Sequence, residues 1–355
     1  MAFEAAQIGA VGAGRMGRGI ATAFAIAGYP VSLIDLRSRD AVAEAALKDA
    51  ALADIDRDIA FLVRSGLMDE TSASRAIGRV TFVPLAGAAD AISKCAILFE
   101  GVAETIDAKA GCLALIGKHA QPDAIIASTT STIDADTLAA LVPDRERFLN
   151  AHWLNPAHLM PLVEVSPSAS TSAAVVARMQ ELLIALGKVP VVCKSSPGYI
   201  VPRIQVLAMN EAARMVEEGV GSAEDIDTAV RVGFGLRFAV LGLLEFIDWG
   251  GGDILHHASA FLSRALDPVR FEAPGIISRN MKQARRGLQD GVGFYTYDNV
   301  DPDLYRAERL SDLVSILRHR NLLPRVASVG CGAGFLESPA DTKEGHCRER
   351  GGTGV

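Results

Sequence analysis

The sequence has few cysteines, and they follow no metal-binding or disulfide pattern. Its 355 residues include five cysteines, an odd number, and no two of them form a Cys-x-x-Cys pair. Structural zinc sites and disulfide frameworks require more regular cysteine spacing. We therefore expect reduced thiols, a cytoplasmic location and no bound metal.

Long apolar runs and clustered basic residues are also missing. The longest uncharged run of interest, residues 19–34, has 16 residues and contains Gly28 and Pro30, whereas a membrane helix needs about 18 or more. The first residues carry Glu4 and no basic residue before an apolar run, unlike a secretory signal. The formal charge is −7, so we expect neither a membrane nor a nucleic acid as a partner.

The composition provides ample material for globular domains. Hydrophobic residues make up 50% of the chain and charged residues 22%, which excludes a disordered or collagen-like protein. A chain of this length typically forms about two domains. No internal repeat of fixed period is visible.

Residues 1–195 alternate short apolar strands with helical stretches, and this pattern predicts βαβ crossovers and a mostly parallel sheet. Helices are expected at residues 15–27, 40–64, 70–77, 107–119 and 172–186. Strands are expected at residues 7–11, 31–35, 80–83, 97–100, 124–127, 148–152, 162–165 and 189–194.

The strand pattern stops near residue 195, where a second domain begins. Residues 196–323 read as an all-α domain, with a break at residues 219–221. Ser222, followed three residues later by Asp225, is typical of a helix start. Residues 324–355 are rich in glycine and charge, and we expect a disordered tail there.

A glycine-rich loop is the strongest local signal. Residues 12–17, GAGRMG, follow an apolar strand and open a helix. Gly12 permits the tight turn, Gly14 lets a diphosphate approach the backbone, and Gly17 lets the helix pack on the strand. The helix N-terminus offers unpaired N–H groups to phosphates. The sequence thus predicts a Rossmann-like dinucleotide site with the contacts Gly12, Gly14, Arg15, Met16 and Gly17.

An acidic residue, Asp35, ends the second expected strand. A carboxylate at this position can accept both ribose hydroxyls of NAD and would repel a 2′-phosphate. NAD is therefore the expected cofactor. The nearby Arg37 and Arg39 leave NADP open.

A polar stretch between two apolar strands contains a candidate acid–base pair, His152 and Glu164. Oxidation of an alcohol by NAD needs a base for the hydroxyl proton, and histidine titrates nearest neutral pH. A carboxylate on the other ring nitrogen would orient the imidazole. Three other interpretations remain: His152 as a core histidine, Glu164 as a solvated strand residue, or a metal site with His158.

Six motifs together resemble the 3-hydroxyacyl-CoA dehydrogenase family, which includes the lambda-crystallin and L-gulonate dehydrogenase branch. They are GAGRMGRGIA, FEGVAETIDAK, STTST, HWLNPAHLMPLVEV, SPGYIVPR and GVGFYTYD, and the resemblance covers residues 6–318. It implies a Rossmann-like domain that binds NAD, followed by a helical domain that forms a homodimer and closes the active site.

The resemblance also implies roles for individual residues. His152 matches the family's general base, Glu164 its orienting carboxylate, and Ser131 a serine that contacts substrate and nicotinamide. Asn155 matches an asparagine near the nicotinamide and the base, and Glu104 and Lys109 match two cofactor contacts. From the residues alone, Ser131 is also consistent with a cap or turn, Asn155 with a turn, and Lys109 with a solvated helix lysine.

The chain departs from the family at several positions. Pro202 stands where an asparagine is usual, and Gln289-Asp290 replaces a lysine before the GxGFY motif. An ungapped count places Ala51 and Asp58 where CoA-dependent members carry a serine and a lysine. The arm around them also holds Asp49, Asp54 and Asp56 against Lys48 and Arg57, a charge that suits a CoA phosphate poorly.

The expected function is the reversible NAD-dependent oxidation of a short L-3-hydroxyacyl-CoA, such as 3-hydroxybutyryl-CoA. One alternative is a free 3-hydroxy acid, such as a sugar acid or a carnitine-like compound. Another is a structural protein that binds NAD without turnover. In the helical domain, residues 238–244 are a candidate dimer core with Arg237 at its edge. His256 and His257 are candidates for the substrate cleft, for a helix surface or for the dimer contact.

Overall fold

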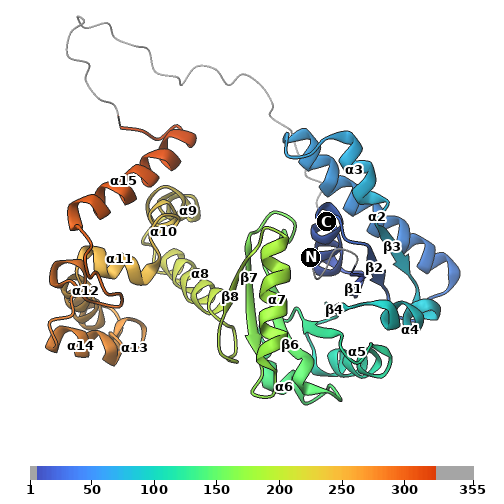
Figure 1. The fold of residues 1–355 in the computed structure, drawn as a ribbon. Coiled ribbons are helices and arrows are strands. Elements are labelled where there is room, and N and C mark those ends of the chain that lie inside the picture. The colour runs from blue at the N-terminus through green and yellow to red at the C-terminus, as the bar shows by residue number, and fades with distance from the viewer. Residues whose placement is uncertain (1–5, 325–355) are drawn as a thin grey trace, which may run out of the picture. The chain divides into compact units, whose positions relative to one another are not determined.

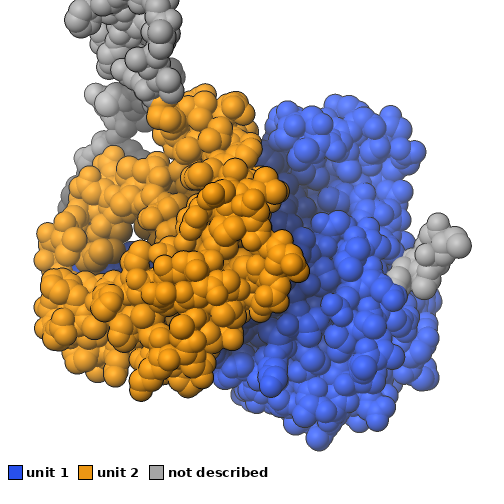
Figure 2. Space-filling model, turned by 60° about the vertical axis from the view of Figure 1, so that its left-hand side comes forward, with its two compact units in different colours: residues 1–214 blue, residues 215–355 orange. Residues whose placement is uncertain are grey.

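A computed structural model describes residues 6–324. The predicted tail, residues 324–355, lies outside the described residues except for its first residue. The described residues fall into two compact units, divided between residues 214 and 215 (Figure 2). The division lies within helix α8 (Val201–Glu217), whereas the sequence predicts the boundary between residues 195 and 196. The two units are described separately below.

Unit 1 is built on one eight-stranded sheet (Figure 1) with the strand order β3-β2-β1-β4-β5-β6-β7-β8. Neighbouring strands are parallel except for the antiparallel pair β6 and β7. This confirms the predicted Rossmann-like, mostly parallel sheet. The strands are β1 (Ile8–Val11), β2 (Val31–Ile34), β3 (Val80–Val83), β4 (Ile97–Glu100), β5 (Ile125–Ser128), β6 (Phe148–Trp153), β7 (Leu162–Pro167) and β8 (Val189–Val192).

Helices connect the strands of unit 1, and many of them start at side chains visible in the sequence. An N-cap side chain accepts a backbone N–H bond at α2, α3, α5, α6 and α7, which satisfies donors that the first helical turn leaves unpaired. The helices before α8 are α1 (Arg15–Ile26), α2 (Ala41–Arg64), α3 (Glu70–Ile77), α4 (Leu85–Lys94), α5 (Ile106–His119), α6 (Ala135–Ala139) and α7 (Ala173–Ala185), with a 3-10 turn at Arg145–Arg147.

Helices α4 and α6 were not predicted from the sequence. Helix α4 has no side-chain cap, and small residues dominate its sequence, LAGAADAISK. Its buried positions, Ala88, Ala91 and Ile92, follow helical spacing, but alanines carry little periodic contrast. Helix α6 has only five residues, too few for a periodic signal. Helix α4 completes the crossover between β3 and β4.

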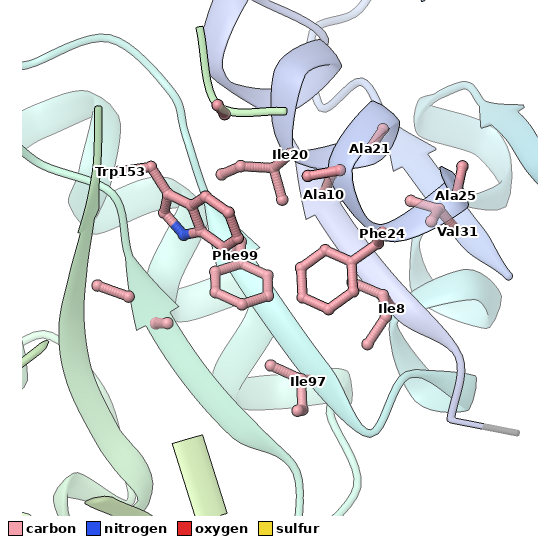
Figure 3. Close-up of a cluster of buried hydrophobic side chains, with 14 of the residues drawn as sticks. Ile8, Ala10, Ile20, Ala21, Phe24, Ala25, Val31, Ile97, Phe99 and Trp153 are labelled. Atoms are coloured by element: carbon pink, nitrogen blue, oxygen red, sulfur yellow. The ribbon is translucent and has the colours of Figure 1, made fainter. Parts of the chain in front are cut away.

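The core of unit 1 lies on both faces of the sheet, because successive strand residues point to opposite sides. In β4, Ile97 and Phe99 join one buried cluster, and Leu98 joins the other. Phe24, Phe99 and Trp153 pack in the first cluster, with ring centroids 5.3 to 6.0 Å apart (Figure 3). Trp153 follows His152 directly, so this aromatic packing fixes the strand end that carries the candidate base.

Unit 2 is helical over the residues that the structure describes. Ser222 accepts the N–H of Asp225 and starts α9, as the sequence predicts. The buried Asp248 accepts the N–H groups of Phe294 and Tyr295 at 3.0 and 2.8 Å, so it holds the GVGFYTYD motif. The helices are α9 (Ala223–Ala229), α10 (Gly235–Phe238), α11 (Leu243–Gly250), α12 (Gly252–Ala265), α13 (Pro268–Phe271), α14 (Gly275–Lys282) and α15 (Pro302–His319), with a π-helical turn at Val230–Phe234 and a 3-10 turn at Leu288–Asp290.

No helix within residues 6–324 combines the length and the apolar character needed to cross a membrane.

Candidate functional site

The glycine loop connects β1 to α1, and its glycines serve different purposes. Gly12 has a φ of +109°, and a Cβ there would lie 2.7 Å from the carbonyl oxygen of Gly101. A Cβ on Gly17 would lie 1.9 Å from the carbonyl oxygen of Gly12. A Cβ on Gly14, by contrast, would meet nothing within 4 Å. Gly12 and Gly17 thus permit close packing, and Gly14 keeps the space in front of the loop open.

A cavity of about 470 Å³ lies in front of this loop. Helix α1 begins at the loop, and its N-cap residue, Gly14, has no side chain to accept the first N–H groups of the helix. Free backbone N–H groups and the positive end of the helix dipole favour a phosphate at this point. The residues therefore fit a dinucleotide. Those that line the cavity include Gly12, Gly14, Arg15, Met16, Asp35, Arg37, Arg39 and Gly101.

Asp35 lines the same cavity, just after β2, and is 5% exposed. The Nε of Arg39 donates to its Oδ2 at 2.6 Å. The hydrogen bond that Arg39 donates to Asp35 raises the pKa of the Arg39 guanidinium. The carboxylate is thus in place for a ribose, and a paired guanidinium lies beside it.

His152 and Glu164 face each other across β6 and β7. The antiparallel register places these two residues directly opposite, and the His152 Nδ1 lies 2.8 Å from the Glu164 Oε2. Glu164 is fully buried and His152 is 5% exposed, so the interpretation of Glu164 as a solvated strand residue is wrong. Within the described residues, no protein group hydrogen-bonds the other ring nitrogen, Nε2, of His152.

The second oxygen of Glu164 is also held. Its Oε1 accepts the N–H groups of Ile200 and Val201, both at 2.9 Å. Burial alone would raise the pKa of the Glu164 carboxyl, but the bonds from His152 and from these two N–H groups outweigh it and lower the pKa. Glu164 therefore stays ionised and braces the imidazole.

Glu104 organises the turn that carries Ser131. Its Oε1 accepts the Ser131 N–H at 2.9 Å and the Thr132 N–H at 3.1 Å, and the Thr130 hydroxyl donates to the same atom. Burial alone would raise the pKa of Glu104, yet these bonds and the charge of Lys109 lower it. The Ser131 side chain itself is exposed, so it is available to a ligand.

Lys109 lies behind Glu104 and is 1% exposed, so its interpretation as a solvated helix lysine is wrong. Its Nζ is 3.1 Å from both carboxylate oxygens of Glu100 and 3.3 Å from Glu104. Ser128 also donates to Glu100, at 2.5 Å. Glu100 was not among the predicted site residues, although its place at the carboxyl end of a buried parallel strand was a usable signal.

Asn155 lines a second cavity of about 480 Å³, together with Gly14 and Arg15. His158 lies on the same wall, with its Nδ1 3.5 Å from the Oδ2 of Asp58. Burial lowers the pKa of His158 more than Asp58 raises it. In the part of the chain that the structure describes, no three His, Cys, Asp or Glu side chains group as metal ligands.

The structure also locates the other residues named from the sequence. Pro202 is the second residue of α8, where a helix needs no N–H donor. Ala51 is fully buried in α2. In unit 2, the Nε2 of Gln289 donates to Asp253 at 3.3 Å. His256 and His257 lie side by side on α12, with their ring centroids 5.4 Å apart.

Comparison with known proteins gives a consistent picture. Residues 7–196 match the NAD binding domain of 3-hydroxyacyl-CoA dehydrogenases, and residues 198–297 match their C-terminal domain. The chain is 32% identical to a 5-formyl-3-hydroxy-2-methylpyridine 4-carboxylate 5-dehydrogenase of Mesorhizobium japonicum, over 88% of this chain and 97% of that one. It is 31% identical to a 3-hydroxybutyryl-CoA dehydrogenase of Bradyrhizobium diazoefficiens, over 85% and 99%.

Solved structures agree. A 3-hydroxyacyl-CoA dehydrogenase structure from Archaeoglobus fulgidus superposes with a TM-score of 0.69 and 31% identity, covering 90% of this chain and 100% of that one. The matched ranges therefore extend into both units and span the positions of the site described above.

Proposed function

The chain belongs to the 3-hydroxyacyl-CoA dehydrogenase family, and on this premise we propose that it oxidises a short L-3-hydroxyacyl-CoA thioester to the 3-ketoacyl thioester, reversibly. NAD is the cofactor of this NAD-dependent oxidoreductase and, when bound, supplies the hydride acceptor. The observation that carries the proposal is the buried His152–Glu164 pair, with an imidazole nitrogen left free for substrate.

His152 acts as the general base in this proposal. Its Nε2 takes the proton of the substrate hydroxyl as the C3 hydride leaves, and in the reverse direction the imidazolium returns the proton. Glu164 holds Nδ1 at 2.8 Å, which fixes the ring orientation and stabilises the imidazolium. The two backbone N–H groups on Glu164 keep that carboxylate from rotating away.

Other residues orient the reactants. The exposed Ser131 hydroxyl binds the substrate oxygen and the nicotinamide side, on a turn that Glu104 holds. Asn155 borders the second cavity beside Gly14 and Arg15, and its amide orients the reactants near the base. The cofactor's diphosphate lies at the glycine loop, and its adenosine ribose is held by Asp35.

A second candidate substrate is a free 3-hydroxy acid. Asp54 and Asp58 line the second cavity, and Arg18 and Arg57, which line it too, are both paired with Asp54. Few uncompensated positive charges are therefore left for a CoA phosphate. The relative from Mesorhizobium is named for a pyridine carboxylate substrate, not for a thioester. The alternative of a structural NAD-binding protein has no such observation in its favour.

Initial-rate assays separate the two substrates. NADH formation is followed with (S)-3-hydroxybutyryl-CoA, with 3-hydroxybutyrate as the matched free acid, and with a sugar acid. The thioester is expected to saturate the enzyme with a kcat/KM at least about 100-fold above that of the free acids. A site that binds the CoA group discriminates strongly against substrates that lack it. Saturation by a free acid alone would replace the thioester proposal with the second candidate.

We also propose that the protein is a homodimer. None of the 17 residues of α8 is buried, and exposed apolar side chains on it include Val206, Leu207 and Met209. A helix with several large apolar side chains exposed favours a protein partner. Light scattering after size-exclusion chromatography should give twice the chain mass of 37.4 kDa, and a monomer at micromolar concentration would exclude the dimer.

A further inference from the structure

We propose that Tyr199 is a positioning residue for His152, and that residues 199–201 form a clamp on both members of the His152–Glu164 pair. The clamp consists of the Tyr199 ring, which stacks on the imidazole, and the next two backbone N–H groups, which bind Glu164. This inference rests on the proposed role of His152 as the base, and it adds the device that keeps this base in place.

The first observation is the stacking of the Tyr199 ring on His152. The two ring centroids are 5.3 Å apart and the planes meet at 24°. Tyr199 is 3% exposed, so it presents almost no surface to a ligand. Tyr199 therefore affects the reaction through its contact with the imidazole, not by binding the substrate.

The second observation is the anchoring of the phenol. The Tyr199 hydroxyl accepts a hydrogen bond from the Asn150 Nδ2 at 2.7 Å and donates to the Ile133 carbonyl at 3.2 Å. Asn150 lies two residues before His152 on β6, so both side chains point to the same face of the sheet. The ring is thus fastened to the strand that carries the base, and its distance from the imidazole is set by that strand.

The third observation is the backbone conformation of the clamp. Tyr199 has a φ of +44°, a left-handed conformation that a bulky residue rarely adopts. Such a conformation persists only where the surroundings hold it, often at functional sites. It directs the N–H groups of Ile200 and Val201 to the Oε1 of Glu164, both at 2.9 Å. One short segment thereby restrains the imidazole from its face and the carboxylate from its far side.

Pro202 explains why the clamp ends at residue 201. Proline has no N–H, so it cannot extend the row of donors, and its fixed φ suits the first turn of α8. Glu164 therefore receives its two backbone bonds from Ile200 and Val201, immediately before this proline.

Two substitutions separate the contribution of the Tyr199 ring from that of its hydroxyl. Tyr199→Leu removes the flat ring, and the matched control Tyr199→Phe keeps the ring and removes only the hydroxyl. We expect Tyr199→Leu to lower kcat about 10- to 100-fold with little change in KM, because misplacing a catalytic group by about an ångström costs on that order. Tyr199→Phe keeps the stacked ring but loses its two anchoring bonds, so its loss of kcat should be clearly smaller than that of Tyr199→Leu. NADH affinity should stay within about 3-fold in both variants, since the clamp lies outside the cofactor loop.

A readout that does not depend on turnover is the NMR spectrum of the His152 ring. The stacked phenol shifts the ring-proton resonances of His152, so these should move in Tyr199→Leu and move less in Tyr199→Phe, which keeps an aromatic ring. Resonances that are unchanged in Tyr199→Leu would overturn the clamp, whatever the activity of the variant.

A double-mutant cycle with His152→Gln distinguishes this inference from the proposed function. If Tyr199 acts through His152, adding Tyr199→Leu to His152→Gln should cause no further loss of kcat. A further loss of about 10-fold in that background would overturn the positioning role. Full activity of His152→Gln alone would instead overturn the proposed base, and the NMR comparison would still decide whether Tyr199 orients the ring.

Discussion

The glycine loop and the His152–Glu164 pair lie in the same unit, yet they are built in opposite ways. The loop functions because side chains are missing: a Cβ on Gly17 would lie 1.9 Å from a backbone oxygen, and the space before Gly14 is open. The pair functions because buried charged side chains all have partners. The loop depends on closely packed backbone and open space, and the pair depends on buried charge that its hydrogen-bond partners compensate.

The difference determines how each site tolerates change. Backbone packing responds to added volume, so the loop is sensitive to a single methyl group. Buried charges respond to the loss of a partner, since an unpaired charge in the interior is costly. The following substitutions test this contrast.

Breaking a buried ion pair should have the largest effect on stability. Lys109→Met leaves Glu100 buried without its cation, and we expect a loss of about 3–5 kcal/mol in the free energy of unfolding. The double variant Glu100→Gln with Lys109→Met removes both charges and should recover most of that loss. Urea denaturation measures both. Equal losses in the single and double variants would show that volume, not charge, governs this region.

The two glycines should respond differently to the same added methyl group. Gly17→Ala forces the backbone of residues 12 and 17 apart and should lower the free energy of unfolding by about 1–3 kcal/mol. It should also weaken NADH binding. Gly14→Ala should leave the melting temperature unchanged, because its Cβ meets open space. It should still weaken NADH binding about 10-fold, a difference of about 1.4 kcal/mol. If Gly14→Ala bound NADH normally, a diphosphate would not approach the backbone there.

Charge compensation also operates at the edge of the cofactor cavity, at Asp35. Asp35→Ser should release Arg39 from its 2.6 Å bond to meet a 2′-phosphate. We expect NADPH binding to improve about 10-fold or more, the scale of a charge-assisted bond, and NADH binding to weaken. Fluorescence titration measures both. The control Asp35→Ser with Arg39→Ala should lose the gain, and an equal gain without Arg39 would show that repulsion by Asp35 alone selects the cofactor.

The substitution Glu164→Gln should have the smallest effect on the free energy of unfolding, and the effect should appear at acid pH. Its pKa is lower in the folded protein, so its bonds add stability above the ordinary glutamate pKa. That stability is lost as the pH falls through the lower folded-state value. Each unit of lowering corresponds to about 1.4 kcal/mol. Unfolding measured from pH 7 downward should show a shallower acid loss in Glu164→Gln than in the wild type. Parallel curves would mean that this carboxylate gains nothing from its partners.

The contrast between the two sites also explains what the sequence could predict. The glycine loop is local, so residues 12–17 and Asp35 were visible in one short stretch. The His152–Glu164 pair depends on the register of β6 and β7, and from spacing alone it remained one interpretation among several. The strands were predicted well because β-branched and apolar runs mark buried parallel strands.

The parts that escaped prediction depend on contacts distant in sequence. Tyr199 reaches His152 from 47 positions away, and Ser128 reaches Glu100 from 28. No local pattern marks a left-handed tyrosine or a lysine buried behind a carboxylate. The resemblance implied that Lys109 contacts the cofactor, whereas the structure buries it against Glu100 and Glu104. That role remains a prediction.

The central claim is that the imidazole of His152, braced by Glu164, takes the substrate proton. It is tested most directly by kcat of His152→Gln, with the better substrate from the initial-rate assays and with NADH affinity measured in parallel. The account predicts a fall in kcat of about 10²- to 10⁴-fold, with NADH bound as tightly as in the wild type. Undiminished turnover by a variant that still binds NADH would contradict it.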